Sequence, residues 1–275
     1  MTGVKELSDP QLEEILQLIH RLYGYDFTGY ALASMHRRVS RFMHAASLHT
    51  FNELKHDLSK NKATFEYFLE QVSVNVTEMF RDPEFFRELK EQVFPRLATY
   101  PLIRIWHAGC ATGEEVFSMA ILLHEAGLLQ RTRIYATDIN PVNIEKAKKG
   151  IMTLQVIKDY TSNYIKAGGV REFSGYYTAL YNNALISKEL RENILFSQHN
   201  LVTDQVFNEF QLVCCRNVMI YFNKALQNKV MHLLHDSLAP LGYLALGPKE
   251  SLLFTEIGSR FEVVSTGSKI FRRIK

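Results

Sequence analysis

The 275-residue sequence predicts an α/β domain preceded by an all-α N-terminal domain. Up to Tyr100, apolar residues recur at the spacing of amphipathic helices. After Pro101, short apolar runs alternate with helical patterns, which is typical of a mostly parallel sheet covered by helices on both faces. We therefore divide the chain into a helical domain, residues 1–98, and an α/β domain, residues 99–275.

The helical domain is predicted from capping signals and periodicity. The run Ser8-Asp9-Pro10-Gln11 offers an N-cap, a first-turn proline and a capping-box glutamine. Apolar residues then recur one helical turn apart: Leu12, Ile15, Leu16, Ile19 and Leu22. Further helices are predicted at 32–46, 51–58 and 64–72, and from Asp82-Pro83 to the break at Pro101.

The α/β domain is predicted from alternating strands and helices. Strands are predicted at 103–106, 133–137, 194–197, 211–215, 242–247, 260–264 and 270–273. Helices are predicted at 114–129, 141–149 and 225–238. The segment of about 153–190, which is rich in tyrosine and contains a Gly-Gly pair, fits this alternation poorly, so we interpret it as an inserted lobe.

Composition and cysteine usage narrow the class of protein. A net charge of +3 gives little support to a nucleic-acid binder. Three cysteines without CxxC spacing argue against a disulfide framework and a zinc site, and His232 and His235 have no further ligands nearby in the sequence, so we expect no metal. The N-terminus is not patterned as a signal peptide, and no run is long and apolar enough to enter a membrane as a span, so we expect a cytoplasmic protein.

A glycine-containing turn after the first predicted strand indicates a ligand crevice. Gly109 and Gly113 permit close backbone approach, and the helix that follows supplies free N–H groups. The spacing is GxxxG rather than GxGxxG, and Glu114 and Glu115 would repel a pyrophosphate. A cationic ligand without phosphate, such as S-adenosylmethionine, suits this site better. Alternatively, both acids only complement the helix dipole.

Polar residues also follow two other strands of the predicted sheet. Asp138 ends the second strand, where a carboxylate can accept hydrogen bonds from ribose hydroxyls; alternatively, it caps the helix that begins near Pro141. Arg216 and Asn217 follow a later strand and face the same crevice. The sequence lacks the Asp/Asn-Pro-Pro-Tyr/Phe segment of amino-group methyltransferases and the Pro-Cys of cytosine methylation, so an oxygen nucleophile is plausible.

The segment Ser73–Arg81 alternates Asn, Thr and Arg with apolar or acidic residues, which is unusual for a linker, although a polar loop with an N-cap has the same composition. Together these motifs resemble the chemotaxis receptor methyltransferase (CheR) family over nearly the whole chain. The matching pieces are the helical domain, Asn75–Arg81, Gly109–Glu115, Ala136–Ile139, Asn200-Leu201 and Cys215–Phe222. The resemblance implies a Rossmann-like S-adenosylmethionine-dependent methyltransferase domain with a small antiparallel β-subdomain inserted at about 153–190.

The resemblance also implies roles for single residues. It places Asn75, Thr77 and Arg81 around the amino-acid end of the cofactor, and Arg216 and Asn217 beside its methionine part. Glu115 and Asp138 would hold polar groups of the cofactor, with Asp138 on the ribose, and Asn200 and Leu201 would lie beside the adenine. Arg81 and Tyr221 would line the entrance for the acceptor carboxylate. The helix with Arg37, Arg38 and Arg41 would dock the receptor.

Three positions depart from the family pattern: Met79 where an aromatic residue is usual, Val116 where proline is common, and His107 where a small residue or cysteine is usual. We expect these to affect packing more than chemistry. The implied reaction transfers a methyl group to glutamate side chains of methyl-accepting chemotaxis receptors, with S-adenosylhomocysteine as the other product, and we expect a monomer. A nicotinamide-dependent oxidoreductase, a noncatalytic binding module and a nucleic-acid methyltransferase are the alternatives.

Overall fold

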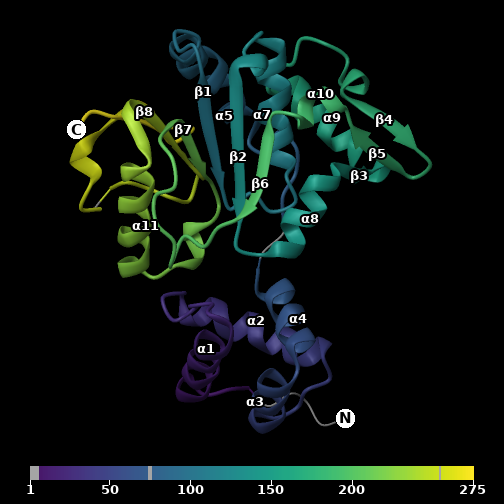
Figure 1. The fold of residues 1–275 in the computed structure, drawn as a ribbon, viewed down its shortest axis with the longest axis vertical. Helices are drawn as coiled ribbons and strands as arrows, with labels where there is room; N and C mark the ends of the chain where they lie inside the picture. Colours follow the sequence, from purple (N-terminus) through teal and green to yellow (C-terminus); the bar gives the residue numbers. More distant parts are fainter. Residues whose placement is uncertain (1–5, 74–75, 254) are drawn as a thin grey trace. The chain divides into compact units, whose positions relative to one another are not determined.

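The computed structural model describes residues 6–73, 76–253 and 255–275 (Figure 1). It divides into two compact units, Met1–Val74 with Tyr221–Lys229, and Asn75–Ile220 with Val230–Lys275. The boundary therefore lies near residue 74 rather than at residue 98. The reason is that the helical stretch after residue 82 buries its apolar side chains, among them Phe86 and Leu97, in the core of the α/β unit.

The first unit contains four complete helices and the first part of a fifth, α11 (Lys224–Asp236), among its described residues. The four complete helices are α1 (Asp9–Tyr23), α2 (Leu32–Ala45), α3 (Phe51–Lys60) and α4 (Lys62–Val72). The predicted N-terminal cap of α1 is confirmed, because Gln11 Oε1 accepts the backbone N–H of Ser8 at 3.0 Å. Leu12, Ile15 and Ile19 are fully buried, as an inward helix face requires.

The second unit is built on a seven-stranded sheet with the order β6-β2-β1-β7-β8-β10-β9. The strands are β1 (Ile103–Ala108), β2 (Thr132–Asp138), β6 (Ile194–Gln198), β7 (Phe210–Cys215), β8 (Leu238–Leu246), β9 (Phe261–Ser265) and β10 (Ile270–Arg273). The first five strands of that order pair in parallel, and β10 pairs antiparallel with both β8 and β9. The predicted mostly parallel sheet is confirmed, and Figure 1 shows β1, β2 and β6 side by side.

Three helical segments among the described residues of this unit precede β1, and its other helices lie between strands in the chain, as predicted. In chain order they are α5 (Pro83–Glu88), the π-helical turn η1 (Leu89–Val93), α6 (Phe94–Leu97), α7 (Glu114–Glu125), α8 (Pro141–Lys149), α9 (Ile157–Lys166), α10 (Lys188–Arg191) and α11 (Lys224–Asp236). Helix α7 stops short of the predicted residue 129, because the chain turns at Gly127 with φ of 69°. All residues of β7 are buried, as a central parallel strand requires.

The predicted antiparallel insertion is confirmed as a three-stranded sheet. Its strands β3 (Ile151–Thr153), β5 (Asn183–Ile186) and β4 (Tyr177–Leu180) pair in that order. Glu125, the last residue of α7, fixes this lobe to the main sheet's helices. Its carboxylate accepts the hydroxyls of Tyr164 and Tyr176 and, at 3.2 Å, the backbone N–H of Val170. Within the described residues, no helix combines the length and apolar character needed to cross a bilayer.

Candidate functional site

The turn between β1 and α7 folds tightly around its two glycines. Gly109 and Gly113 have φ of 78° and 97°, and Ala111 between them is also left-handed. The N–H of Gly109 donates to Thr137 O at 2.8 Å, which ties the turn to the end of β2. A Cβ on Gly109 would lie 2.4 Å from a methyl carbon of Val218, so the turn after β7 packs directly on this glycine. The two glycines are thus required by their left-handed backbone and, at Gly109, by the close approach of the Val218 side chain.

Asp138 braces the same turn from β2. Its Oδ2 accepts the N–H of Ala111 at 2.9 Å, while Oδ1 accepts the Asn140 N–H at 2.8 Å and the Asn143 amide at 3.2 Å. Burial raises the pKa of Asp138, against the effect of these bonds. The cap of α8 is Asn140, which accepts the Val142 N–H, so the alternative of Asp138 as that cap is excluded. With one bond on Oδ2, the carboxylate retains acceptor capacity.

Glu115 belongs to a buried ionic network rather than only to the helix dipole. Its carboxylate contacts His107 Nδ1 and Arg216 Nη1, each at 2.9 Å. The other Arg216 terminal nitrogen contacts Asp82 Oδ2 at 2.8 Å, and the guanidinium lies 3.8 Å from the ring centre of Phe85. The network joins β1, α7, the end of β7 and the residue before α5. His107 therefore makes a polar contact with Glu115, which the expectation that it affects packing more than chemistry did not include.

The network predicts a specific loss of stability in acid. Burial raises the pKa of Glu115, but the hydrogen bond from His107 and the charge of Arg216 outweigh burial and lower it to about 2. The pKa of Glu115 in the folded protein is below its unfolded value of 4.5. The contribution of its ionised form to the free energy of unfolding is therefore complete above pH 4.5 and is lost as pH falls towards 2. This contribution of Glu115 to stability is about 3 kcal/mol at most.

We expect urea denaturation to show a steeper loss of unfolding free energy between about pH 4.5 and pH 2 for the native chain than for Glu115→Gln. Asp138 has a raised pKa and acts in the opposite direction, but it is common to both proteins and cancels in the comparison. Parallel pH profiles for the two proteins would contradict the assigned network.

The segment after β6 adjoins the end of β2. The N–H of His199 donates to Asp138 O at 3.1 Å, which places the next two residues, Asn200 and Leu201, beside the predicted ribose site. Both are buried, and Asn200 Oδ1 accepts the Val202 N–H at 2.9 Å. The side chain of Asn200 therefore shapes its own turn, and its position beside the adenine stays a prediction.

The segment 76–81, which precedes α5, contacts helix α7 and leads into Asp82 of the network. Asn75 lies outside the described residues, and Thr77 is half-buried. The N–H of Phe80 donates to Ser118 Oγ on α7 at 2.8 Å, and Arg81 donates to Val76 O at 3.2 Å. Because Asp82 pairs with Arg216, Arg81 is adjacent in sequence to a member of the network.

Comparison with known families decides the assignment. The chain matches the family model described as "CheR methyltransferase, all-alpha domain" over residues 10–73, and that described as "CheR methyltransferase, SAM binding domain" over residues 75–270. The chain belongs to the CheR methyltransferase family. It is an S-adenosylmethionine-dependent methyltransferase, and the resemblance noted in the sequence is confirmed.

Curated relatives cover the CheR chain from end to end. It is 46% identical to "Putative methyltransferase Cher3" of Pseudomonas putida over 97% of each chain. It is 31% identical to "Chemotaxis protein methyltransferase" of Salmonella typhimurium, over 98% of this chain and 94% of that one. The protein of the same name from Listeria innocua is 30% identical, over 89% of this chain and 92% of that one.

The residues at the carboxyl ends of β1, β2 and β7 fit the cofactor of this family. Asp138 keeps acceptor capacity for a hydroxyl, and each oxygen of Glu115 makes one contact and can accept another donor. Glu114 adds a second acid, which accepts the Thr112 hydroxyl at 2.6 Å. This acidic surround suits a cationic ligand and is unsuited to a pyrophosphate.

The arginines predicted to dock the receptor divide into two groups. Arg37 and Arg41 are exposed on α2, whereas Arg38 is 6% exposed. Arg38 points inward, donates to Val72 O and lies 4.1 Å from the ring centre of Tyr221, within the first unit. Arg38 therefore does not belong to a docking face, because it shares the buried face of α2. The predicted meeting of Tyr221 with Arg81, a residue of the second unit, stays a prediction.

A metal site has weak support in this CheR chain. Among the residues that the structure describes, one group of possible ligands lies within 4.8 Å: His107, Glu115 and Cys214. Both oxygens of Glu115 already have protein partners, His107 Nδ1 and Arg216 Nη1, which a metal ion would have to displace. His232 and His235 have separate partners, with His232 on Glu256 at 3.1 Å.

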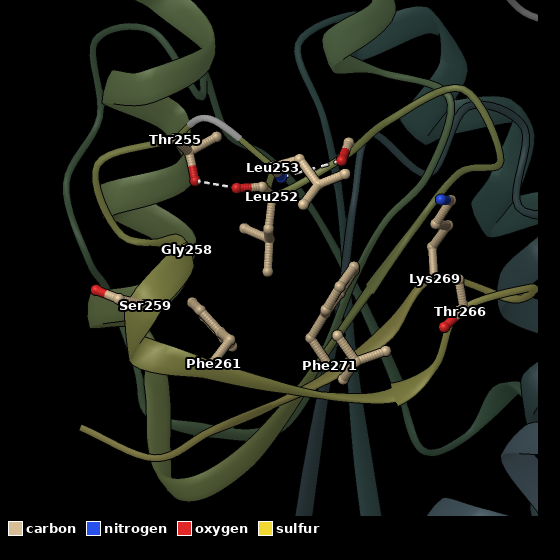
Figure 2. A pocket seen from close by; sticks show the side chains of 11 residues that line it. Leu252, Leu253, Thr255, Gly258, Ser259, Phe261, Thr266, Lys269 and Phe271 are labelled. Atoms are coloured by element: carbon tan, nitrogen blue, oxygen red, sulfur yellow. Dashed lines mark hydrogen bonds between the residues drawn. The ribbon is translucent and has the colours of Figure 1, made fainter.

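Two features of the second unit escaped sequence reasoning. One is Glu250, a buried acid after β8 that binds the turn after β7. The other is an apolar cavity of about 340 Å³ beside β9 and β10, whose lining includes Leu252, Phe261 and Phe271 (Figure 2). The cavity is lined by none of the predicted site residues. No sequence motif marks either feature, because both depend on which strands become neighbours in the folded sheet.

Proposed function

We propose that this CheR chain is a protein-glutamate O-methyltransferase that esterifies side chains on the cytoplasmic helical bundle of methyl-accepting chemotaxis receptors. The observation that carries the proposal is that one chain matches both domains of the family and aligns end to end with chemotaxis protein methyltransferases. The products are glutamate methyl esters and S-adenosylhomocysteine. The enzyme acts in the cytoplasm as a monomer.

The proposed roles of the cofactor-binding residues follow from their contacts. Asp138 accepts from the ribose with its remaining acceptor capacity, and Glu115 accepts from the amino group of the methionine part. Asn200 and Leu201 form the wall beside the adenine. Arg216 has both terminal nitrogens paired with carboxylates, so it orients Glu115 more than it binds the cofactor itself.

The proposed reaction needs no general base. Bound S-adenosylmethionine supplies a methyl group on sulfonium sulfur, so the new O–C bond forms as the C–S bond breaks and no proton moves. A glutamate with a pKa of about 4.3 is already ionised at neutral pH. The chain contributes orientation: Arg81 is proposed to hold the acceptor carboxylate in line, an effect worth roughly 7–11 kcal/mol in favourable cases, and the role of Tyr221 at the entrance stays a prediction.

A labelled-methyl assay tests this function. The protein is incubated with methyl-labelled cofactor and a chemoreceptor cytoplasmic fragment, and the product is then treated with alkali. A carboxyl ester releases the label as volatile methanol. Label that remains on the fragment after alkali would indicate methylation of nitrogen or an ether oxygen, and would overturn the proposed acceptor.

The exposed arginines of α2 predict how the receptor docks. We expect Arg37→Glu with Arg41→Glu to raise KM for the receptor roughly tenfold at low salt, with less effect at high salt, because rim charges mainly steer association. The affinity for S-adenosylhomocysteine should not change. The matched control reverses two exposed lysines elsewhere on the helical unit, Lys60 and Lys62. An equal effect of both pairs would refute a specific docking face.

A further inference from the structure

Glu250 gathers four backbone N–H groups on one carboxylate. Its Oε1 accepts from Val218 at 2.9 Å and Met219 at 2.7 Å, and its Oε2 accepts from Asn217 at 3.0 Å and Gly247 at 2.6 Å. The residue is 5% exposed. Four donors converge on two oxygens, so the ionised carboxylate satisfies the arrangement and a neutral side chain does not.

Three of these donors are consecutive residues of the turn after β7. Asn217 there has φ of 62°, a conformation that costs energy for a side chain other than glycine. A Cβ on Gly247 would lie 2.7 Å from Asn217 N, so the turns after β7 and β8 approach each other backbone to backbone. Without the carboxylate, three successive buried donors would lose their acceptor.

The segment that carries Glu250 is itself held in place. The N–H of Glu250 donates to Gly247 O at 2.9 Å. Just beyond it, Leu253 N–H donates to Ser251 Oγ at 3.0 Å, and the Thr255 hydroxyl donates to Leu252 O at 2.7 Å, bonds that can be followed in Figure 2. Local hydrogen bonds therefore hold the loop that carries Glu250.

The turn held by Glu250 is linked to two parts of the proposed cofactor site, the acidic network and the glycine turn. Arg216, which precedes it, forms the ion pair with Glu115. Val218, in its middle, packs on Gly109 so closely that a Cβ there would clash. A shift of this turn would thus move both the acidic network and the glycine turn.

We propose that Glu250 is a positioning residue for the cofactor site, which presets the 217–219 turn against Gly109 and Glu115 before the cofactor binds. The inference rests on the cofactor-binding part of the proposed function and not on the identity of the acceptor. Glu250 does not touch the reacting atoms. Its effect is to hold the turn in one arrangement, so that ligand binding need not order it.

The test uses Glu250→Gln in the full-length protein, with Glu256→Gln, an exposed acid nearby, as the control. The glutamine keeps one acceptor oxygen and turns an NH₂ towards two N–H groups. We expect calorimetry on the folded variant to show S-adenosylhomocysteine binding weakened about 10- to 100-fold, roughly the loss of one or two charged hydrogen bonds. The control should bind within about twofold of the native chain.

A second measurement separates positioning from a general loss of stability. Hydrogen exchange of the ligand-free Glu250→Gln protein should accelerate at Val218 and Met219 and not in β1 or β2. A folded Glu250→Gln protein with native affinity would overturn the proposal. If that variant does not fold, Glu250→Asp replaces it: its shorter carboxylate should weaken binding at least threefold, and native affinity would overturn the proposal equally. Failure of the native chain to bind the ligand would instead contradict the cofactor assignment.

Discussion

Replacing Asp138 with asparagine weakens the binding of S-adenosylhomocysteine by about 10²- to 10³-fold. The carboxylate accepts the N–H of Ala111 in the glycine turn and the N–H of Asn140 before α8, and it is the proposed partner of the ribose. An amide can present one oxygen only, so at least one buried donor loses its acceptor. Hydrogen bonds to charged groups contribute about 1.5–3 kcal/mol each, and two losses near the lower end of that range give the stated factor.

Isothermal calorimetry of Asp138→Asn measures this effect. Asp159→Asn, an exposed acid at the start of α9, is the matched control and should bind normally. Because Asp138 has a raised pKa from burial, its replacement by a neutral side chain removes a desolvation cost, and the fold should survive. Unchanged affinity in the folded variant would show that the end of β2 is not part of the cofactor site.

Replacing Arg216 with methionine lowers the free energy of unfolding by about 3–5 kcal/mol, the usual cost of breaking a buried ion pair. The side chain of Arg216 is 2% exposed, and that of Glu115 is 20% exposed. Loss of the guanidinium removes the ion pairs with both Glu115 and Asp82, leaves Glu115 with His107 as its remaining contact in the network, and removes the stacking on Phe85.

Urea denaturation at neutral pH measures this loss, with Arg260→Met, an exposed arginine, as the control. The double variant Arg216→Met with Glu115→Gln should recover part of the lost stability, because the buried carboxylate is then neutral. No recovery would mean that the packing of Arg216 on Phe85, rather than its charge, dominates its contribution.

The succession of strands and helices along the α/β unit could be predicted from sequence because each strand is a separate apolar run and each helix carries its own signal. The glycine turn, Asp138 and Arg216 were predicted at the crevice because all follow a strand, and the carboxyl ends of parallel strands meet at one edge. Arg38 was misassigned to a docking face, although its spacing from Met35 and Phe42 on α2 fits the buried side.

Other features could not be predicted, because they depend on contacts between residues that are far apart in the sequence. The ion pairs of Arg216 join residues 101 and 134 positions apart in the sequence. Glu250 binds a turn 31–33 positions before it, and the contact exists only because β7 and β8 are neighbours. The boundary of the helical unit also depends on the core in which Phe86 and Leu97 are buried. Apolar periodicity predicts that they lie on the buried face of a helix but not which core that face packs against.

The acceptor chemistry is tested most directly by peptide mapping of a chemoreceptor cytoplasmic fragment after incubation with this protein and S-adenosylmethionine. Transfer to glutamate predicts peptides heavier by one methylene group, with the added mass on glutamate side chains and absent after mild alkali. Added mass on lysine, arginine or serine would contradict it, as would an unmodified fragment in a reaction where the protein binds the cofactor.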